Sequence, residues 1–360
     1  MYPISRREFL HTLITGAGAV LLTACSADSN PSPEAQTSVQ QPVEPAQPTA
    51  SEFESQPVTE ASTPTEAVAS EPQAEPAGAE PAAAEPAQPL AGTPHMAVAR
   101  GPDPETLVRR SIEALGGMGV FVPQGAWVII KPNICVAYNT YEYASTTNPW
   151  VVGALVKLAL EAGAGKVQVM DNPFGGTPDQ AYVRSGIKEQ VEAAGGEMVT
   201  MAAFKYVDMD IPQGLDINKW GVYDDILNAD VLIDVPIAKH HGLARLTLGM
   251  KNLMGTVSDR GGLHANLGQR LADITSRLRP ALTVVDAVRI LTANGPTGGS
   301  LDDVQQLNTV IASADIVSAD AYAATLFGKQ PDDISYIAKA AAMGLGRSDL
   351  DNLTIDEISV

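Results

Sequence analysis

The stretch Ala126-Trp127-Val128-Ile129-Ile130, followed by Lys131-Pro132-Asn133, decides the fold of this chain. Five apolar residues in a row, bounded by turn-forming residues, are typical of a short strand that is buried on both faces. Such a strand needs a packed layer on each side of its sheet. The stretch therefore indicates a sheet that is covered by helices on both faces.

Similar apolar runs recur along the chain. The sequence predicts further strands at 96–100, 167–170, 231–235, 281–285 and 309–312. Apolar periodicity and helix stop signals predict helices at 104–115, 148–162, 179–194, 267–278, 316–327 and 333–342. Strands that alternate with helices predict an α/β domain over residues 96–360, with a mostly parallel sheet and helices on both faces, a Rossmann-like three-layer arrangement.

Polar groups follow four of the predicted strands. In parallel sheets, ligands bind beyond the carboxyl ends of the strands. We therefore expect these groups to meet at one edge of the sheet: Lys131-Pro132-Asn133, Asp171-Asn172, Lys239-His240-His241 and Asp286.

Residues 1–24 have the features of an export signal. Arg6 and Arg7 resemble a twin-arginine motif, and the apolar stretch from Leu13 to Leu22 is too short to span a bilayer. The segment ending at Cys25 resembles a lipobox, which implies that Cys25 is acylated after cleavage. We predict export by the twin-arginine machinery and a lipid anchor outside the cytoplasm. The alternative is an uncleaved anchor helix.

The segment 25–95 predicts a disordered stalk. Between residues 27 and 95 lie 13 of the 26 prolines and 11 acidic residues, with no Lys or Arg. A stretch with so few large apolar residues cannot offset the entropy cost of ordering.

Composition excludes several classes for the remaining 265 residues. Their net charge of −9 argues against nucleic-acid binding. Once Cys25 is assigned to lipid, Cys135 is the one cysteine left, so neither a disulfide nor an iron–sulfur cluster is expected.

Several motifs together resemble the domain of unknown function 362 family, across essentially all of residues 96–360. Its opening motif is similar to residues 125–133, and its second to Thr146-Thr147-Asn148-Pro149. Its most distinctive block is similar to residues 236–242, followed by residues 249–255. Many relatives carry an added ferredoxin-like cysteine cluster that this sequence lacks. The family's biochemical role is not settled, so the resemblance implies a fold and a site more than a reaction.

Lysines and amides at the expected edge are candidates for binding a small anionic molecule. A cationic or amide side chain beyond a strand end can hydrogen-bond an anion. A strand-end lysine could instead face solvent, and Lys251 could extend from a core helix to the surface. The ligand-binding candidates are Lys131, Asn133, Thr147, Lys251 and Asn252.

Lys239, His241 and His264 are the catalytic candidates. Adjacent residues on an extended segment point to opposite sides, so His241 rather than His240 is expected to face a pocket. A neutral imidazole can bind a metal or transfer a proton. The alternatives are a surface loop for the histidine pair and a local backbone carbonyl as partner for His264.

A divalent metal is one cofactor that the same edge could hold. The candidate ligands are His241, His264, Asp171 and Asp286, a set that rests on sheet topology because no spacing rule supports it. Asp171 could equally cap a turn.

Two functions remain open from sequence. One is an exported, lipid-anchored, metal-assisted enzyme acting on a small anionic substrate. The other is a non-catalytic lipoprotein that captures a ligand for a membrane partner. Buried His and Asp converging on one compact sheet would favour catalysis, and two lobes with a hinge would favour binding.

Overall fold

The computed structural model describes residues 92–360. The predicted export signal, Cys25 and nearly all of the predicted stalk lie outside these residues. Among residues 92–360, no helix has both the length and the apolar character needed to cross a bilayer.

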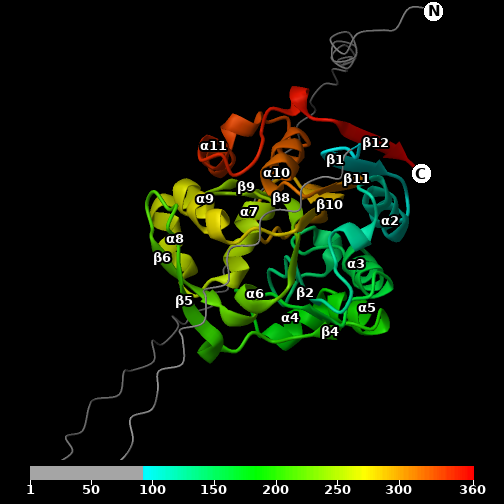
Figure 1. Cartoon of the computed structure of the whole chain (residues 1–360), viewed down its shortest axis with the longest axis horizontal. Coiled ribbons are helices and arrows are strands. Elements are labelled where there is room, and N and C mark those ends of the chain that lie inside the picture. Colours follow the sequence, from blue (N-terminus) through cyan, green and yellow to red (C-terminus); the bar gives the residue numbers. More distant parts are fainter. Residues whose placement is uncertain (1–91) are drawn as a thin grey trace, which may run out of the picture. The chain divides into compact units, whose positions relative to one another are not determined.

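Within the described residues, ten strands form one mixed sheet with mostly parallel pairs (Figure 1). The order across the sheet is β12 (Ile355–Ser359), β1 (Met96–Arg100), β11 (Val304–Ser313), β10 (Leu282–Leu291), β7 (Val231–Val235), β2 (Trp127–Pro132), β3 (Lys166–Val169) and β4 (Glu197–Met198). Strand β8 (Ile237–His241) pairs with β10, and β9 (Arg245–Thr247) pairs with β8.

Parallel pairing joins β10, β7, β2, β3 and β4, which confirms the predicted class of sheet. Strand β11 runs antiparallel to both of its neighbours, β10 and β1, a reversal that the sequence pattern did not predict. A separate antiparallel pair consists of β5 (Tyr206–Asp210) and β6 (Lys219–Tyr223).

Helices cover both faces of the sheet. One core contains residues of α2 (Pro104–Ala114), α3 (Pro149–Glu161), α4 (Pro178–Arg184) and α5 (Ile187–Ala193). The other contains residues of α6 (Asp224–Asn228), α7 (Gly249–Asn252), α8 (Arg260–Leu263), α9 (Leu267–Arg277), α10 (Ile316–Thr325) and α11 (Ser335–Ala342). Along β2, Val128 and Ile130 join the first core and Ile129 joins the second, as expected for a strand buried on both faces.

Two boundaries differ from the predicted ones in ways that matter for the site. The predicted helix at 179–194 is two helices, because Gly186 adopts φ 76° between α4 and α5. Strand β10 does not end at 285 but continues to Leu291, paired with β11 and β8. Asp286 therefore lies inside a strand rather than at its end.

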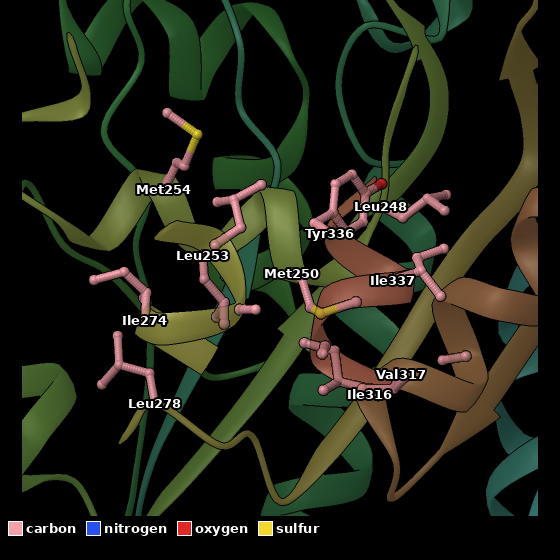
Figure 2. Close-up of a cluster of buried hydrophobic side chains, with 14 of the residues drawn as sticks. Leu248, Met250, Leu253, Met254, Ile274, Leu278, Ile316, Val317, Tyr336 and Ile337 are labelled. Atoms are coloured by element: carbon pink, nitrogen blue, oxygen red, sulfur yellow. The ribbon is translucent and has the colours of Figure 1, made fainter. Parts of the chain in front are cut away.

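Apolar side chains hold the short helix α7 in place (Figure 2). Figure 2 shows Met250 and its flanking residues Leu248 and Leu253 gathered with residues of α9, α10 and α11. A four-residue helix has little stability of its own, so this packing fixes its position. The polar residues Lys251 and Asn252 of the same helix line a cavity.

Candidate functional site

A cavity of about 370 Å³ lies beyond the carboxyl ends of β2 and β3 and beside β8. Its volume is in the range of small-molecule sites. The lining contains every predicted ligand-binding, catalytic and metal-ligating residue except Thr147 and Asp286: Lys131, Asn133, Asp171, Lys239, His241, Lys251, Asn252 and His264.

Lys131 forms an ion pair with Asp171 at the base of this cavity. The ammonium lies 2.8 Å from Oδ1 of Asp171, and it donates to the carbonyl of Pro132 at 2.8 Å and to Oδ1 of Asn252 at 3.0 Å. Both charged side chains are almost fully buried. A lysine ammonium has three protons, and these three acceptors occupy them. Lys131 therefore supports the site rather than offering a free cation to a ligand.

Two amide side chains extend this network across the cavity. Asn252 accepts from Asn133 Nδ2 at 2.9 Å and donates to Asp234 at 2.8 Å. Oδ1 of Asn133 accepts from Lys239 at 2.9 Å, and Lys239 also donates to the carbonyl of Ser145. We call the connected set of Asp171, Lys131, Asn252, Asn133 and Lys239 the floor network. Its partners are mostly satisfied within the protein, which makes it a rigid base.

Two glycines allow the backbone to approach buried carboxylates closely, one of them in the floor network. A Cβ on Gly255 would overlap Oδ1 of Asp171 and would lie 2.6 Å from Nζ of Lys131. A Cβ on Gly249 would lie 2.8 Å from Oδ1 of Asp320. Asp320 is buried, and its carboxylate accepts from the backbone N–H groups of Gly249 and Met250. Glycine at both ends of the segment 249–255 is thus required by contacts with carboxylates.

Lys251 differs from the other two lysines. Among the contacts of the described residues, its ammonium has no hydrogen bond and no ion pair, although its side chain is largely buried and lines the cavity. Burial, and next the nearby charge of Lys239, lower the pKa of Lys251 to about 8. Arg260 also lines the cavity and uses one nitrogen to donate to the carbonyl of Asn172 at 2.7 Å.

His241 presents a hydrogen-bond donor to the cavity. Its Nδ1 accepts from the backbone N–H groups of Leu243 at 3.2 Å and Ala244 at 3.1 Å. The ring proton therefore resides on Nε2 in the neutral imidazole. Burial, followed by the charges of Lys251 and Lys239, lowers the pKa of His241 to about 3. His241 consequently stays neutral at physiological pH.

In His264 the donor and acceptor nitrogens are exchanged relative to His241. Its Nδ1 lies 2.8 Å from the carbonyl oxygen of Arg260, and because that oxygen can only accept, Nδ1 carries a proton. In the neutral ring, Nε2 of His264 therefore has a free lone pair. The local carbonyl partner considered from sequence is present, and the ring also lines the cavity. His240 instead accepts from the backbone N–H of Gly295 and does not line the cavity.

Thr147 and Asp286 have structural roles instead of lining the cavity. Thr147 is buried, accepts from the Asn133 backbone N–H and donates to the Val235 carbonyl. Asp286 accepts from the backbone N–H groups of Asn148 and Val288 and so fixes the start of α3. Burial raises the pKa of Asp286 to about 6.

Three of the four residues predicted as metal ligands, His241, His264 and Asp171, line the cavity, and Asp286 does not. Asp286 lies away from the cavity, Asp171 is paired with Lys131, and Nε2 of His241 is protonated. Within residues 92–360, no group of three or more His, Cys, Asp and Glu side chains is arranged to hold a metal ion. Asp286 is outside the lining because it was expected at the end of a strand that in fact continues past it to Leu291.

Several lining residues were not among the predicted site residues. Arg260 and the apolar Phe174 and Met254 line the cavity. The one sequence signal near them is Gly261-Gly262, next to Arg260, where the backbone can approach a ligand closely. Thr247 Oγ1 is buried in the lining and has no hydrogen-bond partner. The buried thiol of Cys135 lies beside Lys239, and burial raises its pKa despite that cation.

The fold and the site define an α/β protein with a cationic cavity at the carboxyl edge of its sheet, lined by four lysine and arginine side chains, two histidines and one carboxylate. The family model described as "Domain of unknown function (DUF362)" matches residues 128–325. The chain belongs to this family.

The chain is similar to a curated relative and, more distantly, to several solved structures. A thylakoid-associated protein of Synechocystis sp. is 29% identical over 248 residues, which cover 66% of this chain and 74% of that protein. The lactate racemase apoprotein from Thermoanaerobacterium thermosaccharolyticum aligns over 64% of this chain and 56% of its own, with 11% identity and a TM-score of 0.41. A protein from Thermotoga maritima aligns over 64% and 60%, with 13% identity and a TM-score of 0.40. The chain thus spans less than two thirds of either structural neighbour, and neither likeness carries a conclusion on activity.

Proposed function

We propose that this protein is an exported lipoprotein enzyme that binds a small organic anion in the cationic cavity and performs acid–base chemistry on it. The observation that carries the proposal is Lys251, a largely buried ammonium whose described surroundings provide no counter-ion. Burying a charge without a partner is costly, so a site that retains one is suited to an anionic ligand.

The base and the wall of the cavity would have different roles. The base is the floor network, and we call the lining residues Lys251, Arg260, Thr247, Phe174 and Met254 the wall. The floor network holds its own partners and would keep the site rigid. Lys251 and the free nitrogens of Arg260 would bind the anionic group, and Thr247 Oγ1 could gain the hydrogen bond that it lacks. Phe174 and Met254 would contact an apolar part of the ligand.

The two imidazoles support acid–base chemistry over simple capture. Nε2–H of His241 can stabilise developing negative charge, while Nε2 of His264 can accept a proton. A site with a donor and an acceptor of this kind can move a proton across a bound ligand. The proposed chemistry needs no metal, because the ring nitrogens of His241 and His264 supply the donor and the acceptor.

Titration calorimetry of the full chain tests the binding step. Benzoate is the probe, and benzamide, its neutral analogue of the same shape, controls for charge. We expect benzoate to bind and benzamide to bind at least about tenfold more weakly, since a hydrogen bond to a charged group contributes roughly 1.5–3 kcal/mol.

Lys251→Met should weaken benzoate binding at least about tenfold, whereas Lys339→Met, at an exposed position on α11, should leave it unchanged. Equal affinities for benzoate and benzamide, or an unaltered affinity in Lys251→Met, would contradict the proposal.

A further inference from the structure

The amine of Lys251 is chemically distinct from the other lysines of the cavity. The three protons of Lys131 are taken by Asp171, Pro132 and Asn252. Lys239 donates to Asn133 and Ser145 and is almost fully buried. Lys251 has no such acceptor among the described contacts, so its nitrogen is the one that a bound molecule can reach.

The surroundings of Lys251 also favour its neutral form. Burial and the charges of Lys239, Arg260 and Lys131 lower its pKa to about 8. With that pKa, about one molecule in ten has a neutral amine at pH 7. A lysine that is desolvated beside other cations is a recognised arrangement for an amine nucleophile.

We propose that Lys251 forms an imine with the carbonyl carbon of a small oxo acid whose carboxylate is bound by Arg260. This inference rests on the proposed function, because the cavity must first bind the acid as an anion. It narrows the substrate class from small organic anions to those that carry a ketone or aldehyde. Phe174 and Met254 on the lining suit an oxo acid with an apolar side chain.

The step balances without an oxidant or a reductant. The neutral Nζ of Lys251 adds to the carbonyl carbon, an N–C bond forms, and the C=O π pair moves to oxygen. A proton passes from nitrogen to that oxygen, with Nε2 of His264 as the acceptor on the way and Nε2–H of His241 as a hydrogen-bond donor to the oxygen. The hydroxyl then takes one proton from solvent and leaves as water, which gives a protonated imine.

Reductive trapping tests this chemistry on the full chain. The protein is incubated at pH 7.5 with pyruvate or phenylpyruvate and sodium cyanoborohydride, and the modified peptides are identified by mass spectrometry. We expect one adduct on the peptide that contains Lys251, formed faster as the pH rises toward 8 and suppressed by benzoate.

Two variants separate chemistry from charge. Lys251→Arg keeps a cation at the site but cannot form an imine, so the adduct should disappear while benzoate still binds within a few fold of the native affinity. Lys339→Met should give the same Lys251 adduct as the unaltered chain, because Lys339 is exposed and does not line the cavity.

The outcomes distinguish the two proposals. Benzoate binding with no adduct on Lys251 from either oxo acid would overturn the imine and leave anion binding standing. Adducts spread over exposed lysines at the same rate as Lys251 would also overturn it. Neither binding nor adduct would overturn both.

Discussion

Breaking the buried ion pair between Lys131 and Asp171 should show how much the floor network contributes to stability. Lys131→Met removes the ammonium and keeps an apolar side chain of similar length. Asp171 then remains 4% exposed, with only the backbone N–H groups of Ile134 and Asn172 as donors. Asp171→Asn is the reciprocal change, since it leaves Lys131 with two neutral acceptors.

The expected magnitude follows from the burial of both partners. Removing one member of a buried pair leaves an uncompensated charge, which costs about 3–5 kcal/mol. The cost of Asp171→Asn in the free energy of unfolding should be about 3 kcal/mol, because Lys131 keeps its hydrogen bonds to Pro132 and Asn252. The double variant has no unpaired charge, so its cost should fall short of the sum of the single costs by about 3 kcal/mol or more.

Guanidinium unfolding of the full chain, followed by tryptophan fluorescence, measures these free energies. All three tryptophans, Trp127, Trp150 and Trp220, lie within the described residues, and Trp127 begins the strand that carries Lys131. Lys188→Met is the matched control, because Lys188 pairs with Glu192 on an exposed helix surface and its loss should cost less than about 0.5 kcal/mol.

Two results would refute the reasoning: single costs below about 1 kcal/mol, or additivity of the two substitutions within about 0.5 kcal/mol.

Three further predictions follow from other parts of the molecule. Gly255→Ala should destabilise the chain by about 1–3 kcal/mol in guanidinium unfolding, because the added Cβ would displace the buried ion pair. Gly119→Ala is the control, and it should cost under about 0.5 kcal/mol because no atom lies near the added Cβ. Equal effects of the two substitutions would contradict this prediction. Burial raises the pKa of Asp320 to about 7, so the stability that its protonated carboxyl contributes should be lost as the pH rises from about 4 to about 7. Asp320→Asn should therefore reduce the fall of the free energy of unfolding with pH by up to about 1.4 kcal/mol per pH unit, measured by unfolding at pH 4.5 and 6.5. An unchanged pH dependence would count against the assigned pKa. Cys25→Ser should move the protein from the membrane fraction to the soluble fraction of the producing cells on immunoblots, and retention in the membrane would contradict the predicted lipid anchor.

The sequence predicted the sheet and most of the site because both follow from regular patterns. Apolar runs mark buried strands, and the ends of parallel strands meet at one edge, which brought Lys131, Asp171 and Lys239 together although they are far apart in the chain. The same rule failed for Asp286. Asp286 interrupts the apolar run directly after Val285, so the run resembled a finished strand, whereas pairing with β11 and β8 carries β10 on to Leu291.

What the pattern could not predict is which polar groups bind each other. The pairing of Lys131 with Asp171 depends on atoms brought within 3 Å by tertiary packing, and no local signal encodes it. The tautomers of His241 and His264 likewise depend on single backbone partners, two N–H groups in one case and a carbonyl in the other. Those partners determine which ring can donate and which can accept.

These partners divide the basic residues of the cavity into those that hold its base together and those that are proposed to bind the ligand. The floor network satisfies its own hydrogen-bonding groups, and any rearrangement there would leave a buried polar group unpaired, at roughly 1–3 kcal/mol each. The wall of the cavity is different, because Lys251 and Thr247 Oγ1 have no hydrogen-bond partner within residues 92–360, and under the proposed function a bound ligand would supply one. A substitution in the floor network should therefore reduce stability and binding together. A substitution of Phe174, which is 58% exposed, should change which anion binds while leaving the free energy of unfolding nearly unaltered. A substitution of Met254 should affect both, because Met254 also packs in the core.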